Sequence, residues 1–127
     1  MYGFSKNLDA SFEDVLPRVK DALKDQGFGV LTEIDVKDTL RKKLDVEFRK
    51  YIILGACNPP LANRALSEEL EIGLLLPCNV IVYENEAGGS TVSVIDAEKM
   101  LTVVGRDDLK GFAAEVNDKL KKALESV

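Results

Sequence analysis

Histidine is absent from this chain of 127 residues. Without an imidazole, the chain cannot form a Ser/His/Asp or Cys/His nucleophile system, a histidine-ligated metal site or a switch that titrates near neutral pH. Cysteine is scarce as well: Cys57 and Cys78 are the only two, and they form no Cys-x-x-Cys motif. These absences exclude the most familiar catalytic signatures, so the sequence names no reaction by itself.

Long basic runs are also missing. The chain has 17 Lys and Arg against 22 Asp and Glu, which gives a net charge of −5. Its densest basic stretch, residues 41–43, lies between Asp38 and Asp45 and is too short to follow a phosphate backbone. We therefore expect no nucleic-acid partner.

No segment has the features of a membrane span or a signal peptide. The two longest charge-free windows, residues 51–63 and 72–83, are shorter than the ~20 residues that cross a bilayer. The first residues lack the charged start and apolar core of a signal peptide, and Asp9 and Glu13 follow closely. We expect a cytoplasmic protein with no membrane partner, in which both windows are buried or face a partner.

The size and composition are those of one globular domain. A chain of 14.0 kDa buries roughly two-thirds of its unfolded surface around one core. Its 46% hydrophobic and 31% charged residues are typical of a soluble protein, and they argue against disorder. The sequence predicts a single domain over residues 1–127.

Hydrophobic periodicity predicts an alternating series of strands and helices. In chain order, the patterns predict a strand over residues 2–8, a helix from Ser11 to Gly27, a strand over 28–35, a helical segment over 36–44, a strand over 46–54, a helix from Pro59, strands over 80–84 and 91–96, and a helix capped by Asp107. Ser11 or Asp14 caps the first helix; if Ser11 does, Pro17 removes one early backbone hydrogen bond.

Short connections between neighbouring strands favour an α+β fold. We predict a mainly antiparallel sheet of about five strands, with two long helices on one face and short helical insertions. Several strands are apolar on both sides, as in residues 51–54. Because no chain is left to cover the second face, the sequence predicts that another copy covers it, in a homodimer.

Two segments carry the residues that suggest a site. Each cysteine is followed by asparagine, lies beside proline and falls inside a charge-free window. The candidate binding residues are Gly55, Cys57, Asn58 and Pro59 in the first segment, and Pro77, Cys78 and Asn79 in the second. The order of elements indicates that the two segments meet at one edge of the sheet.

These segments resemble the bacterial and archaeal domain-of-unknown-function family numbered 302. The resemblance is carried by residues 51–59 and 72–80, and it extends over nearly the whole chain, including 27–35 and 94–96. It implies a fold similar to that of the TATA-binding protein, in the order strand, helix, four strands and helix, and a tendency to form homodimers. It implies no activity.

Four interpretations of the paired Cys-Asn segments remain open. The thiols could carry redox or sulfur chemistry, although no base lies near enough in sequence to lower a thiol pKa. Thiolates could bind Cu(I) or, in a dimer, Zn²⁺. The asparagine amides could be the polar groups of an apolar groove that binds a small apolar or amphipathic ligand. Finally, both segments could be plain core and turn.

We predict binding or assembly rather than catalysis, without a metal or cofactor. The function is then that of a homodimeric module with an apolar-lined Cys-Asn site. The alternative is a thiol-dependent redox or sulfur-handling protein that uses Cys57 and Cys78. A further acidic cluster of Glu68, Glu69 and Glu71 is typical of a solvated helix end.

Overall fold

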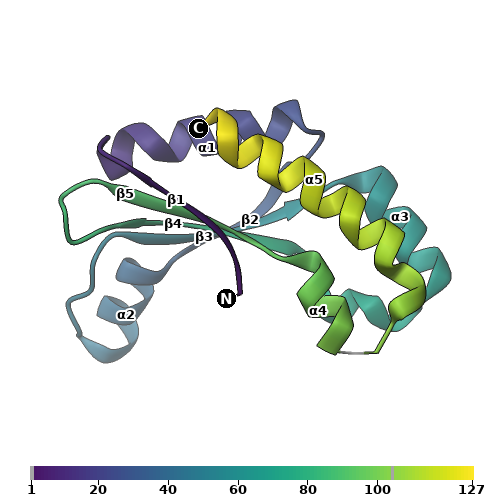
Figure 1. The fold of residues 1–127 in the computed structure, drawn as a ribbon. Coiled ribbons are helices and arrows are strands. Elements are labelled where there is room, and N and C mark those ends of the chain that lie inside the picture. The colour runs from purple at the N-terminus through teal and green to yellow at the C-terminus, as the bar shows by residue number, and fades with distance from the viewer. Residues whose placement is uncertain (1, 104) are drawn as a thin grey trace.

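A computed structural model describes residues 2–103 and 105–127 (Figure 1). The elements are β1 (Gly3–Leu8), α1 (Phe12–Asp25), β2 (Gly29–Asp35), α2 (Val36–Leu44), β3 (Tyr51–Cys57), α3 (Pro59–Glu68), the 3-10 helix η1 (Leu70–Leu75), β4 (Cys78–Glu84), β5 (Ser90–Ile95), α4 (Ala97–Val103), the 3-10 turn η2 (Asp107–Leu109) and α5 (Lys110–Ser126). The strands form one five-stranded sheet in the order β1-β5-β4-β3-β2. All four neighbouring pairs are antiparallel, which confirms the predicted α+β class.

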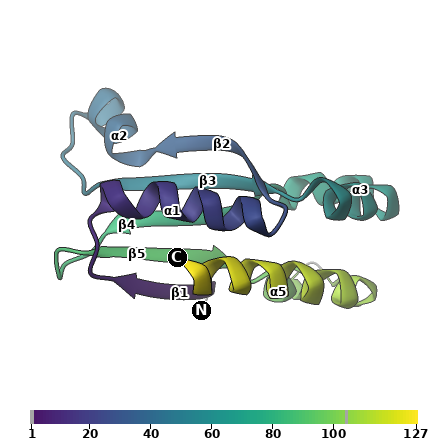
Figure 2. The same cartoon turned by 90° about the horizontal axis from the view of Figure 1, so that it is seen from above.

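The two long helices, α1 and α5, cover the same face of the sheet (Figures 1 and 2). Alternation along the strands directs every second side chain toward them. The core between sheet and helices includes Leu54, Val80, Val82, Val92 and Val94 from the strands, and Val15, Val19, Leu23, Leu120 and Ala113 from the helices. The predicted arrangement of helices on one face is confirmed.

The first helix, α1, begins at the capping residue that the sequence predicts. Ser11 is its N-cap, and the Ser11 hydroxyl accepts a hydrogen bond of 3.2 Å from the backbone N–H of Asp14. Pro17 therefore lies inside the helix. Gly27, just beyond the end, has a φ of 84°, a conformation that glycine adopts without steric cost.

Two sequence predictions need correction. Residues 46–50 form no strand, and β3 runs from Tyr51 to Cys57 instead of over 46–54. Asp45, with a φ of 53°, ends α2 in the left-handed conformation, and the residues that follow it run to β3 as irregular chain. The last α-helix begins at Lys110, after a 3-10 turn that opens at Asp107, so Asp107 is not its cap. The helices η1 and α4 were not predicted separately.

The chain has no helix in the described ranges, 2–103 and 105–127, that is long and apolar enough to cross a bilayer.

Candidate functional site

The fold brings the two Cys-Asn segments together at one end of the sheet. β3 ends at Cys57 and β4 begins at Cys78. In the antiparallel register, Ala56 faces Cys78 and Gly55 faces Asn79. The two cysteines are therefore displaced by one residue rather than directly opposite each other.

The two thiols have different environments. Cys78 is 9% exposed, and burial, together with the nearby Cys57, raises the pKa of its thiol to about 11. Cys57 is half-buried. Both cysteines border a cavity of about 20 Å³, closed by Phe28, Leu61 and Phe112 among others. This volume has no room for an organic ligand, and a thiol with a raised pKa is a poor nucleophile at neutral pH.

We expect thiol reagents to label Cys57 roughly tenfold faster than Cys78 in the folded protein at pH 7.5. The reason is that Cys78 is both buried and held in the protonated form. Iodoacetamide labelling followed by mass spectrometry of peptides measures the two rates, with the urea-unfolded chain as control. Equal native rates would contradict the assigned environments, and fast labelling of Cys78 would support the redox alternative.

Asn58 and Pro59 start α3. Asn58 is the N-cap: its Oδ1 accepts a hydrogen bond of 3.3 Å from the Leu61 backbone N–H. Its Nδ2 donates to the carbonyl oxygen of Gln26 at 3.3 Å, which links α3 to the end of α1. Pro59 occupies the first helical position, where its missing N–H costs no hydrogen bond. Both residues thus have a role in holding the fold.

Gly55 and Pro77 pack against each other beside β2. A Cβ atom on Gly55 would collide with the Thr32 hydroxyl and would lie 2.7 Å from Cγ of Pro77. The glycine therefore allows a side chain from β2 and the proline ring to approach β3 closely. Asn79 follows on the exposed side of β4, and its side chain has no hydrogen-bond partner within residues 2–103 and 105–127.

On the sheet face opposite α1 and α5, the outward side chains of the strands are uncharged, and the charged helix α2 lies on this side beside β2 (Figure 1). We call this surface, formed by the outward positions of the five strands, the open face. Its members are Gly3, Ser5 and Asn7; Thr32 and Ile34; Tyr51, Ile53 and Gly55; Asn79, Ile81 and Tyr83; and Thr91, Ser93 and Ile95. The Tyr51 and Tyr83 rings stack with centroids 5.4 Å apart. None of these side chains is charged, although 31% of the chain is.

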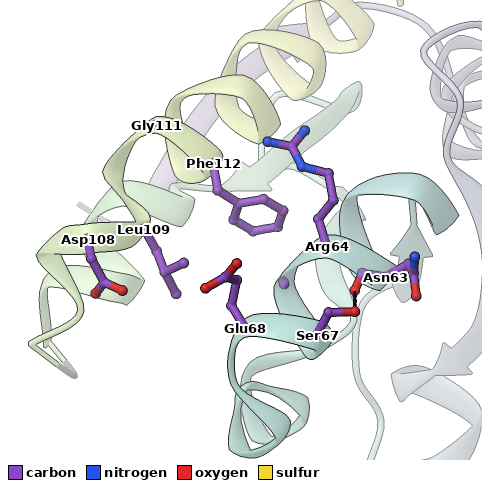
Figure 3. Close-up of a pocket in the computed structure, with 9 residues that line it drawn as sticks. Asn63, Arg64, Ser67, Glu68, Asp108, Leu109, Gly111 and Phe112 are labelled. Carbon is purple, nitrogen blue, oxygen red and sulfur yellow. Dashed lines mark hydrogen bonds between the residues drawn. The ribbon is translucent and has the colours of Figure 1, made fainter.

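A larger groove lies between α3 and the start of α5 (Figure 3). Its volume is about 550 Å³, and its lining comes from α3, η2 and α5. Sequence reasoning missed it, because it depends on how two helices distant in sequence are placed. Of its lining residues, the sequence singles out Glu68 alone, in a cluster typical of a solvated helix end. The described residues contain no cluster of three or more His, Cys, Asp or Glu side chains placed to hold a metal ion.

Comparisons with known proteins place the chain in a family. A comparison with curated proteins finds no match. Among solved structures, the chain is similar to the crystal structure of an uncharacterized conserved DUF302 protein from Bacillus stearothermophilus, with 28% sequence identity and a TM-score of 0.92. The similarity covers 99% of this chain and 98% of that one. Residues 4–127 match the family described as "Domain of unknown function DUF302". The chain therefore belongs to the DUF302 family.

Proposed function

We propose that this protein is a homodimeric assembly module in which two copies stack their open faces. One observation carries the proposal: every outward position of the five strands is uncharged in a chain of net charge −5. Two copies that each carry a net charge of −5 repel each other overall. An uncharged, partly apolar face is the surface on which they can approach without that cost.

The side chains on the open face suit such an interface. Ile53 and Ile81 are cross-strand neighbours near its centre, and the stacked Tyr51 and Tyr83 lie beside them. Aromatic and aliphatic anchors at the centre of a patch contribute most of the affinity in typical interfaces. Two sheets that pack face to face lie about 10 Å apart, so side chains of this size fill the layer between them.

Asn79 gives this interface a polar element. Its amide is exposed and unpaired in the described part of the single chain. In a symmetric dimer, equivalent surfaces meet, and an amide can both donate to and accept from the same group on the partner. A paired asparagine in an apolar interface fixes the register of association. This gives one residue of the predicted Cys-Asn site a role in assembly.

Light scattering after size exclusion tests the dimer directly. We expect a mass of twice 14.0 kDa at micromolar concentration for the unaltered chain, and the monomer mass for Ile81→Asp. The aspartate brings like charges together in the interface, and the side chain at position 81 lies outside the helix-covered core. Circular dichroism verifies that the variant is folded.

Leu70→Asp is the matched control, because Leu70 lies outside the sheet in η1 and is 83% exposed. This control should keep the dimer mass. A monomeric mass for the unaltered chain, or a folded Ile81→Asp variant that still forms dimers, would overturn the proposal.

A further inference from the structure

The groove between α3 and the start of α5 has a size and a lining that suit a small amphipathic molecule. Its volume of about 550 Å³ falls within the range of small-molecule sites. The Phe112 ring points into it from α5, with Arg64 and Glu68 of α3 on either side (Figure 3). Leu109 adds a second apolar contact.

Two of the charges around the groove are already compensated. Arg64 pairs with Glu115 at 3.0 Å. Asp108 receives two hydrogen bonds from the Arg106 guanidinium, at 2.9 and 2.8 Å. Arg106 also pairs with Glu69 at 2.8 Å, so Asp108 and Glu69 share one guanidinium.

Glu68 is different. Its carboxylate has no hydrogen-bond or ion-pair partner among residues 2–103 and 105–127. It also lies in the last turn of α3, where free carbonyl groups add partial negative charge and no basic residue offsets it. An acidic side chain at this end of a helix is slightly unfavourable even when it is exposed, as Glu68 is, and an approaching cation removes that cost. The groove thus has one uncompensated negative end beside an aromatic ring.

Gly111 widens the groove on the α5 side. A Cβ atom at this position would meet nothing within 4 Å, and its backbone φ is not positive. Neither packing nor conformation therefore requires glycine. Alanine would favour the helix, because glycine is a poor helix former. The missing side chain leaves open space in the groove instead.

We infer that this groove binds a small organic cation, a primary ammonium group attached to a short apolar body. The ammonium pairs with Glu68 and the carbonyl end of α3, while the apolar body lies on Phe112 and Leu109. The aromatic ring contributes to holding the cation. This site lies outside the open face, so the inference does not depend on the dimer.

An amide NMR titration with three probes of one carbon skeleton tests the charge requirement. Butylammonium is expected to shift the signals of Glu68, Gly111 and Phe112 with a Kd on the order of 1 mM. Butanol and butyrate carry no positive charge and are expected to leave these signals in place. Shifts of equal size with all three probes, or none with butylammonium, would overturn the inference.

Two variants test the named residues. Glu68→Gln should weaken butylammonium binding roughly tenfold, whereas Glu125→Gln, the same change in the last turn of α5, should leave it unaltered. Gly111→Ala should weaken binding roughly fivefold while raising the unfolding temperature, a combination that simple damage to the fold does not produce. Unchanged affinity in Glu68→Gln would contradict the site. The Ile81→Asp monomer should bind as the unaltered chain does, which separates this result from that of the dimer.

Discussion

Replacing Asn117 with aspartate is expected to lower the free energy of unfolding by about 3 kcal/mol at pH 7, and by clearly less near pH 4. Asn117 is only 4% exposed. Its Oδ1 accepts a hydrogen bond of 2.8 Å from the Ala97 backbone N–H, and its Nδ2 donates to Oδ1 of Asp96 at 2.9 Å. Aspartate has the same shape but loses this donor and adds a second buried negative charge beside Asp96.

The pH dependence follows from the pKa of Asp96. Burial acts to raise this pKa, but hydrogen bonds from Asn117 and from the backbone N–H groups of Lys99 and Glu98 outweigh burial and lower it. A lowered folded-state pKa stabilises the fold above the unfolded pKa of about 4, and that contribution is lost as the pH falls through the folded pKa.

In Asn117→Asp the pH dependence of stability has the opposite sign. Two carboxylates that share a buried site raise the pKa of one of them above its unfolded value. The variant therefore binds a proton on folding, and its deficit shrinks as the pH falls from 7 toward 4. Urea unfolding followed by circular dichroism at both pH values measures the difference. Asn63→Asp, the same change at an exposed position of α3, is the control; an equal deficit at both pH values would contradict the assigned network.

Leu54→Ala is expected to lower the free energy of unfolding by about 3 kcal/mol, and Ile53→Ala by no more than about 1 kcal/mol in the monomer. The two residues are adjacent in β3 but lie on opposite faces. Leu54 is 0% exposed beneath the helices, so its truncation leaves a cavity, whereas Ile53 lies on the open face.

Urea unfolding measures both changes, at protein concentrations at which light scattering gives the monomer mass, so that association does not add to the apparent stability. Losses of similar size would mean that the two faces of the sheet are equally buried in the single chain, contrary to the structure. Concentrations that give the dimer mass should show a larger loss for Ile53→Ala, because the interface then adds to the effect.

The sequence predicted the elements whose signals are local. Ser11 caps α1 through a contact three residues away, and α5 shows a long apolar stripe, so both were found. Residues 46–50 alternate as a strand does, but their main-chain direction is set by Asp45 and by distant partners. Lys37 Nζ donates to the Phe48 carbonyl at 2.8 Å, and the Glu84 N–H donates to the Lys50 carbonyl at 3.0 Å. Periodicity carries no information on such contacts.

The candidate site also has features that sequence predicts and features that it does not. The antiparallel order of β3 and β4 predicts that the two Cys-Asn segments lie side by side. It does not predict the environment of each residue, because the burial of Cys78 and the hydrogen bond from Asn58 to Gln26 depend on how the helices pack. The groove at Glu68 and Gly111 has no sequence signature, since its walls come from helices more than forty positions apart.

The strand order has a consequence for how the chain folds. The strands from β2 to β5 pair in sequence order, so the partner of each of these later strands has already been synthesised. β1 is the exception, because Gly3 pairs with Ile95 and Leu8 with Ser90. Closing so large a loop is entropically costly and slow. During synthesis β1 therefore has no sheet partner until β5 has emerged, and the first of the five strands to be made is the last to join the sheet.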